Sequence, residues 1–347
     1  MSQPIAKDKS STIVSVDRDV ARAIVRHRKW VDKKPGGQKI DLSEKDFTNR
    51  DLAYLVLTGA AMSGAKLIGA CLTEAQLIKT DLSYADLTSA DLRNADLTKA
   101  NLRGACLRKA NLTNAVLTAA DFRADAEVEG VKSEHDPADL SDCNFDSASL
   151  AEARLSGADL SGSRFVGANL DGAMLTGANL TRADFTGASL RGAVLSRACI
   201  DKAIFEGADL SGARMDHALV QYVNFKRANL SDANVEGVDF STSELEGATL
   251  LIDSRRIARH LRRSLEDHEK WVESRGEKGA RAVLKNEDLS FVDLAGRNLS
   301  AIVLTGSRLR SCNLSGSVLA LADLSGGRSQ QRQYGRMCVA GRGFIAR

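Results

Sequence analysis

Apolar residues recur at every fifth position over most of this chain. The stretch ADLTSADLRNADLTKANLRGACLRKANL places a leucine at each fifth residue, and this spacing runs unbroken from Leu42 to Phe122. It resumes from Leu140 to Leu250 and again from Leu284 to Leu324, so that the three runs hold 17, 23 and nine apolar centres. A period of five matches neither an α-helix, with a period of 3.6, nor a plain strand, with a period of two.

A small residue, usually alanine, stands two positions before each centre. Residues two apart in extended chain point to the same side, so we expect the alanine and the centre to face inward and the other three residues to face outward. Glycine is frequent two positions after the centre, as at Gly157 and Gly162, where a corner needs a permissive backbone. Each five-residue segment is therefore predicted to form one side of a polygon.

The phenylalanines indicate the number of sides. Five of them occupy every fourth centre along part of the second run: Phe145, Phe165, Phe185, Phe205 and Phe225. Like side chains stack when successive coils lie about 4.8 Å apart, so this spacing predicts four sides per coil and a ladder of rings inside the tube. By the same count, the three runs make about four, nearly six and about two coils.

The repeated A-(D/N)-L-x-x pattern resembles the pentapeptide-repeat family over about 245 residues of the chain. The resemblance implies an all-β solenoid, a right-handed quadrilateral β-helix with four pentapeptide repeats per coil. Its handedness comes from the resemblance and not from the periodicity. The resemblance implies much less about activity, because members of the family differ in function.

Two segments outside the runs have helical periodicity and resemble each other. Residues 1–39 contain HRKWV after a candidate N-cap at Asp17, residues 251–283 contain HEKWV, and each segment leads into a fresh run of repeats. Because the open end of a solenoid presents unpaired backbone groups, we expect these segments to form short capping α-helices. A lone histidine on an apolar helix face is more often structural than a ligand, which favours caps over ligand sites. The residues assigned to the caps are His27, Trp30, His268 and Trp271.

The patterns divide the chain into seven segments. These are an N-terminal lead-in (1–39), a first solenoid run (40–122), an acidic loop (123–139), a second run (140–250), a second helical lead-in (251–283), a third run (284–324) and a basic Gly/Arg tail (325–347) that is expected to be disordered. Two coils alone make a marginal core, so the third run is expected to dock against something. Whether it stacks on the long solenoid or forms a separate one stays open.

The loop at 123–139 interrupts the period and carries six acidic and two basic residues. A tolerated insertion is the favoured interpretation, because surface loops accept extra residues at little cost. Its alternative is a binding element, since loops that project from the tube matter to function in some members of the family that the chain resembles. The candidate contact residues are Glu127, Glu129, Glu134, His135 and Asp136.

Charge is distributed unevenly about a net value of +3. The lead-in carries +6, residues 40–250 carry −11 and the tail carries +5. An acidic rod resembles, in part, the quinolone-resistance members of the family, which protect DNA gyrase by imitating duplex DNA. However, 14 of the 31 acids stand just before a centre, where asparagine replaces aspartate, as at Asn101 and Asn111. Hydrogen bonding at the corner is the simpler cause, and the basic tail also departs from the apolar C-terminal element of those members.

A run of arginines precedes the third run of repeats. Its members are Arg255, Arg256, Arg259, Arg262 and Arg263. Such a run suits a nucleic-acid or acidic-membrane patch. The acids of the following segment, LEDHE, favour instead the solvated face of a helix whose other side packs.

Catalytic motifs are not apparent. The sequence has no phosphate-binding glycine loop, no H-E-x-x-H and no nucleophile elbow, and the six cysteines form no C-x-x-C pair. We therefore expect no catalytic, cofactor-binding or metal-ligating residues, no membrane span and a location in the reducing cytoplasm of a bacterium.

Three hypotheses about function follow. The first is a non-enzymatic scaffold that binds a protein partner, of unknown identity, through its outer faces and acidic loop. The second is DNA gyrase binding by imitation of DNA. The third is nucleic-acid binding through the basic helix and tail, which is the least favoured of the three.

Overall fold

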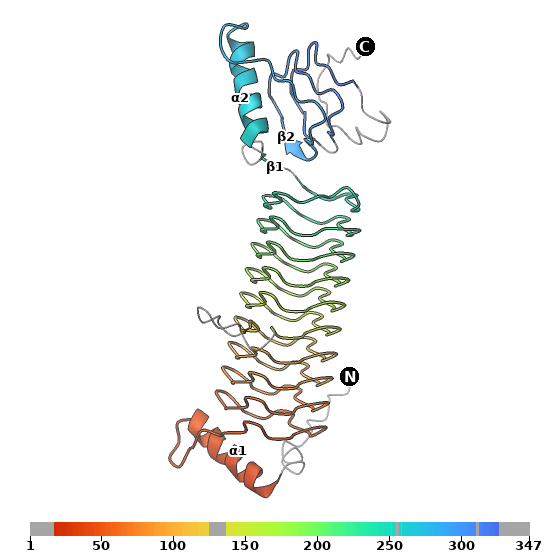
Figure 1. Ribbon diagram of the computed structural model, residues 1–347. Coiled ribbons are helices and arrows are strands. Elements are labelled where there is room, and N and C mark those ends of the chain that lie inside the picture. The colour runs from red at the N-terminus through yellow and green to blue at the C-terminus, as the bar shows by residue number, and fades with distance from the viewer. Residues whose placement is uncertain are drawn as a thin grey trace, which may run out of the picture. The chain divides into compact units, whose positions relative to one another are not determined.

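The chain forms two compact units, each built from a helix and a solenoid (Figure 1). The computed structural model describes residues 17–124, 137–250, 252–253, 257, 259–309 and 312–325. The first unit holds residues 1–229 and 234–248, and the second holds residues 230–233 and 249–347. The third run of repeats thus belongs to a different unit from the first run and from most of the second run.

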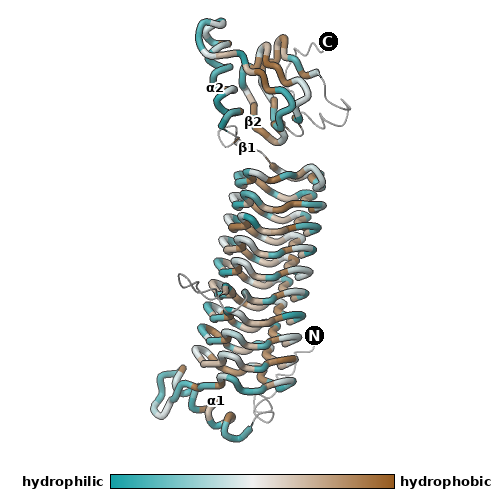
Figure 2. The backbone as a smooth tube through the Cα atoms, in the orientation of Figure 1, coloured by the Kyte–Doolittle hydropathy of each residue, from teal (hydrophilic) through white to brown (hydrophobic). Residues whose placement is uncertain are grey.

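The first unit consists of helix α1 (Arg18–Val31) and a right-handed quadrilateral β-helix. Parallel bridges join residues that are four repeats apart, as from Asp41 to Ala61 and from Ala61 to Asp81. Backbone hydrogen bonds accompany each bridge, and the Met62 N–H, for example, donates to the Asp81 carbonyl at 2.8 Å. Four repeats per coil are therefore confirmed. Hydrophilic and hydrophobic stretches alternate along the coils, whereas α1 and α2 are largely hydrophilic (Figure 2).

Each corner of a coil is a tight turn that starts at a centre. At Leu82 the carbonyl accepts a hydrogen bond from the Ala85 N–H at 3.1 Å, and Tyr84 between them has a φ of 58°. Gly157 occupies the equivalent position with a φ of 74°. A left-handed conformation costs a residue other than glycine about 1–2 kcal/mol. The hydrogen bonds to the neighbouring coils offset this cost, since the Tyr84 N–H donates to the Arg103 carbonyl at 2.9 Å.

The centres and the small residues before them fill the interior. The phenylalanine ladder is fully buried, and its successive ring centroids lie 4.7, 4.6, 4.8 and 5.4 Å apart from Phe145 to Phe225. The ladder ends where Phe240 meets Phe225 edge-on, at 5.7 Å and 67°. Packing loosens at this end of the unit, where Phe240 is 8% exposed.

An insertion interrupts the first solenoid without ending it. Cys106 pairs with Asp139 and not with residue 126, so the insertion lengthens one coil by the segment 125–137. The Ala138 N–H already donates to the Phe122 carbonyl at 3.2 Å, and Arg154 pairs with Asp121 one coil later. The coils on the two sides of the insertion are therefore continuous.

The second unit repeats this plan on a smaller scale. Strand β1 (Ile252–Asp253) pairs in parallel with strand β2 (Val292–Asp293), and helix α2 (Arg259–Glu273) lies between them in the chain. Parallel bridges with the same four-repeat period run from Val283 through Val303 to Asp323.

Helix α2 contributes to the core of the second unit. Leu261 and Leu265 belong to the same buried cluster as Leu284, Leu289 and Leu294 of the coils. Full burial of a leucine stabilises a fold by about 1.5–3 kcal/mol. The helix thus supplies apolar surface that two coils alone would lack.

Candidate interaction surfaces

Each unit starts with a buried histidine that binds the backbone of its first coil. His27 is 0% exposed, and its Nδ1 accepts a hydrogen bond from the Ile40 N–H at 3.2 Å. His268 is also 0% exposed and accepts from the Ala282 N–H at 3.1 Å. Ile40 and Ala282 both stand two residues before the first centre of their solenoid. The imidazoles thus pair backbone groups that would otherwise remain unpaired at an open end.

Burial favours the neutral form of both imidazoles. It lowers the pKa of His27 and the pKa of His268, and the neighbouring cations Lys39 and Arg281 act in the same direction. For His27, the nearby backbone of Thr58 and Leu57 opposes this lowering of the pKa. Neither residue forms a hydrogen bond with His27 Nε2. A neutral imidazole whose Nδ1 accepts a hydrogen bond carries its proton on Nε2. Burial thus favours neutral imidazoles at both positions.

The tryptophans lie outside the histidines. Trp30 stacks on His27 with ring centroids 5.4 Å apart, and Trp271 stacks on His268 at 5.7 Å. Trp30 remains 41% exposed, and its indole lies next to Gly59. A Cβ atom added to this glycine would be 3.5 Å from the indole ring. The histidine thus occupies the interior position, while the indole covers the outer surface of the histidine.

The predicted N-cap at Asp17 lacks the side-chain hydrogen bond of a capping residue. Asp17 precedes α1, and its carbonyl accepts a hydrogen bond from the Ala21 N–H at 2.9 Å, but its side chain forms no capping hydrogen bond. Helix α1 ends at Val31, shortly before Pro35.

The structure does not describe most of the predicted contact residues. Outside the described residues lie Glu127, Glu129, Glu134, His135, Asp136, Arg255, Arg256 and the tail from residue 326 onward. Of the remaining arginines, Arg259 and Arg263 are exposed on α2, and Arg262 lies 3.8 Å from Glu266. The described part of this basic helix is thus partly neutralised by its own acids.

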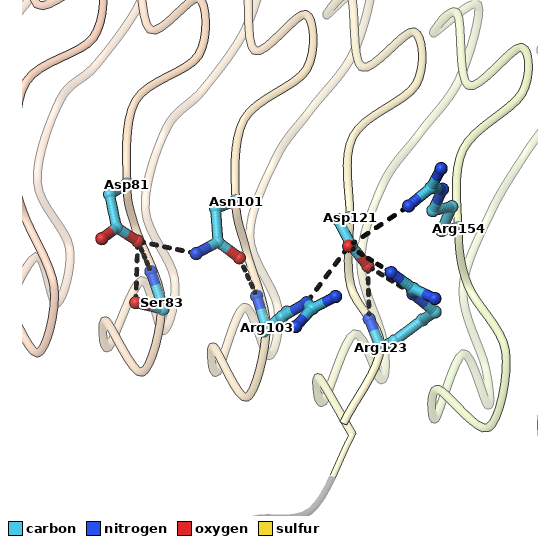
Figure 3. Close-up of polar contacts among 7 residues, drawn as sticks. All are labelled: Asp81, Ser83, Asn101, Arg103, Asp121, Arg123 and Arg154. Carbon is cyan, nitrogen blue, oxygen red and sulfur yellow. Dashed lines mark hydrogen bonds and ion pairs between the residues drawn. The ribbon is translucent and has the colours of Figure 1, made fainter. Parts of the chain in front are cut away.

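Aspartate and asparagine have the same role just before the centres. Asp81 Oδ1 accepts a hydrogen bond from the Ser83 N–H at 3.2 Å, and Asn101 Oδ1 accepts from the Arg103 N–H at 3.4 Å (Figure 3). Between coils, Asn101 Nδ2 donates to Asp81 Oδ1 at 2.9 Å. These side chains therefore stabilise the corners, as the interchange of the two residue types indicates.

Acidic residues just before the apolar centres occur on all four sides of the first solenoid. Each ladder of parallel bridges corresponds to one side of the solenoid, and each side contains at least two of these acids. Examples from the four sides are Asp81 and Asp121, Asp86 and Asp159, Asp91 and Asp184, and Asp96 and Asp209. Among the described residues, the negative charge of these positions is not concentrated on a single side.

One site combines three arginines with a single carboxylate, on the side that contains Asp81 and Asn101 (Figure 3). Asp121 accepts hydrogen bonds from Arg123 Nε at 2.9 Å and Nη2 at 2.8 Å, and from Arg103 Nε at 3.1 Å. Arg154 Nη1 lies 3.9 Å from the same carboxylate. Burial opposes the ionisation of Asp121, but the hydrogen bonds and charges of Arg123 and Arg103 outweigh it and lower the pKa to about 2. We call these four residues the arginine cluster.

Sequence reasoning missed the arginine cluster. Arg103 and Arg123 are separated by four repeats, so the period alone places them on successive coils. The interval from Asp121 to Arg154 is not a multiple of five, and it becomes one coil only when the insertion is subtracted. The signal for the third arginine was therefore hidden by the insertion.

Two further searches of the described residues gave negative results. No group of three or more His, Cys, Asp or Glu side chains in the described part of the chain could hold a metal ion. Within the same residues, neither helix is long and apolar enough to cross a bilayer.

Comparisons with known proteins agree with this architecture. The family described as pentapeptide repeats matches in eight copies. The matched residues are 40–77, 75–114, 95–124, 138–177, 168–207, 208–247 and 288–326. No curated protein sequence matches the chain.

Several solved structures are similar to parts of the chain. HetL of the cyanobacterium Nostoc, a pentapeptide repeat protein involved in the regulation of heterocyst differentiation, is 31% identical, with a TM-score of 0.25, over 64% of this chain and 93% of its own. The fluoroquinolone resistance protein QnrB1 is 19% identical, with a TM-score of 0.32, over 61% of this chain and 90% of its own. A thylakoid-lumen pentapeptide repeat protein of Arabidopsis thaliana is 34% identical, with a TM-score of 0.23, over 26% of this chain and 70% of its own.

The coils, their corners and their Leu/Ala/Phe interior define a four-sided β-solenoid. Because the family match extends over well more than half of its length, the chain belongs to the pentapeptide-repeat family.

Proposed function

We propose that this protein is a non-enzymatic scaffold that binds a protein partner through the outer sides of its first solenoid and the acidic loop. The complete filling of the interior carries this proposal. Leu87, Leu92 and Phe185 are all 0% exposed, and the same holds along almost the whole run of centres. Among the described coils, packing of this kind leaves no room inside the tube for side chains to converge on a substrate. Recognition therefore has to use the exterior, which consists of long ladders of regularly spaced side chains.

The acidic loop is the element that interrupts these ladders. Cys106 pairs with Asp139 and Asp121 pairs with Arg154, so the coils before and after the loop remain paired. Such an insertion can carry binding residues without weakening the scaffold, since loops accept changes cheaply. Deletion of the segment 125–137 restores the regular interval of one coil between Cys106 and Asp139.

This deletion gives the test of the proposal. The intact chain and the deletion variant are each immobilised, and the proteins captured from the native lysate are compared. We expect a partner that is retained by the intact chain and lost with the loop. The matched control keeps the full loop length but replaces its acids, Asp125, Glu127, Glu129, Glu134 and Asp136, with amides. Equal capture by the intact chain and both variants, at unchanged melting temperature, would refute the role of the loop.

DNA imitation receives less support as a function. A mimic of duplex DNA needs rows of negative charge on the surface that meets the enzyme, whereas the corner acids of this solenoid are distributed over all four sides. A supercoiling assay with purified DNA gyrase tests this alternative directly. We expect no inhibition and no protection from a quinolone at micromolar protein.

A further inference from the structure

Among the described residues, the arginine cluster has a local surplus of positive charge. Three guanidinium groups face one carboxylate, and each of the three arginines pairs with Asp121. The side chains of Arg103, Arg123 and Arg154 are 29%, 35% and 52% exposed, while that of Asp121 is 18% exposed. The carboxylate is thus less exposed than the arginines: it accepts hydrogen bonds from Arg123 and Arg103 and lies within ion-pair distance of Arg154, and the guanidinium groups remain accessible from outside.

Other ion pairs on the same solenoid are balanced. Arg93 binds Asp91 at 2.6 Å, which reproduces the relation of Arg123 to Asp121 at the same spacing in the chain, but with a single arginine. Arg164 lies between two acids, Asp146 at 2.9 Å and Asp184 at 3.9 Å. Pairs of this kind satisfy the corners and leave no surplus positive charge. The ratio of three arginines to one aspartate therefore exceeds what the corner requires.

We propose that Arg103, Arg123 and Arg154 bind a phosphorylated side chain of the protein partner, an inference that rests on the scaffold function proposed above. A phosphate monoester carries a charge of about −1.5 to −2 at neutral pH, which matches the surplus of two positive charges, whereas a single carboxylate would balance only one. Guanidinium groups suit this ligand because they present fixed pairs of N–H donors to phosphate oxygens.

The probes for the test are inorganic phosphate and the tripeptide Gly-phosphoSer-Gly, titrated into the full-length protein. Binding is followed through the Nε–Hε resonances of the arginines by NMR. We expect selective shifts of the three arginines of the cluster. Arg103→Gln or Arg154→Gln should weaken binding about tenfold, the effect of losing one charge-assisted hydrogen bond.

Two further variants separate charge from structure. Asp121→Asn should strengthen phosphate binding several-fold because it raises the surplus to three charges. The amide can still accept the Arg123 N–H, as Asn101 does for Arg103. Arg93→Gln is the matched control and should leave the affinity unchanged.

Several results would overturn the proposal. Equal shifts at Arg93 and in the arginine cluster would show unselective anion binding, and equal affinity for Gly-Glu-Gly would remove the preference for phosphate. Selective binding of duplex DNA by the arginine cluster, with a steep dependence on salt, would assign it to nucleic acid instead. A partner that requires the loop but binds the Arg103→Gln and Arg154→Gln variants normally would refute this inference alone. Phosphopeptide binding without any partner in the capture experiment would refute the scaffold function alone.

Discussion

Replacement of Phe185 by alanine measures how much the ring ladder contributes to the stability of the first unit. The ring is 0% exposed and lies between Phe165, with centroids 4.6 Å apart, and Phe205, at 4.8 Å. Truncation of a buried phenylalanine costs about 3–5 kcal/mol through lost burial and the cavity that remains. The two stacked contacts account for about 0.5–1.5 kcal/mol each within that total. Because each coil contacts only its neighbours, little relaxation from elsewhere is expected to refill the cavity.

The assay is urea denaturation of the full chain followed by far-ultraviolet circular dichroism. Met174→Ala, which truncates an outward side chain that is 43% exposed, serves as the control and should change stability by no more than about 0.5 kcal/mol. A double-mutant cycle with Phe165→Ala isolates the stacking contribution, which should appear as a coupling of about 0.5–1.5 kcal/mol. A Phe185→Ala protein with the same unfolding midpoint as the control would refute the placement of these rings in the core.

Three further predictions concern the caps and the corner ladder. Burial lowers the pKa of His27 and of His268 below the ordinary value of 6.5, so the unfolded chain binds more protons than the folded chain below that pH. The free energy of unfolding should therefore fall as the pH drops below 6.5. Leucine at both positions should reduce this dependence of stability on pH, as measured by calorimetry. A slope identical in the double variant would contradict the assignment of neutral caps. Asn101→Asp would place a second carboxylate against Asp81, at the 2.9 Å contact now made by the amide. The free energy of unfolding should fall by about 1–2 kcal/mol at pH 7 and by less at pH 4, where the carboxylates are partly protonated. Urea denaturation at both pH values measures the difference. Gly37→Ala would place a Cβ against the backbone of α1 and should cost about 1–3 kcal/mol, seen as faster amide exchange in that helix; unchanged exchange would argue against the close approach.

Much of the solenoid could be predicted because its regularity is local. Every centre is apolar because it faces the interior of the tube, so the five-residue period identifies the inward positions. The spacing of Phe145, Phe165 and Phe185 fixes four sides per coil. The role of the corner aspartates also follows from local chemistry, since asparagine can replace them only if hydrogen bonding matters more than charge. The handedness was supplied by family resemblance.

The candidate contact residues were harder to predict. The acidic loop has no period that would place its side chains, and the structure does not describe residues 125–136. The repetition of the histidine–tryptophan pairs predicts that they are caps, yet their sequence does not say which of the two rings lies inside. The smaller imidazole of His27 occupies the buried position because its Nδ1 pairs the Ile40 N–H, a bond that the indole, which is only a donor, could not make.

The sequence alone determined the polygon, its inward residues and the two helical lead-ins, because each depends on a pattern repeated within a short stretch of chain. Only the tertiary structure decided which distant side chains meet. The insertion at 125–137 lengthens the interval between Asp121 and Arg154 in the sequence but leaves the coils paired, and Arg154 therefore lies beside the carboxylate that Arg103 and Arg123 already share. The division into two units likewise depends on the packing of α2 with its own coils, which no short stretch of sequence encodes.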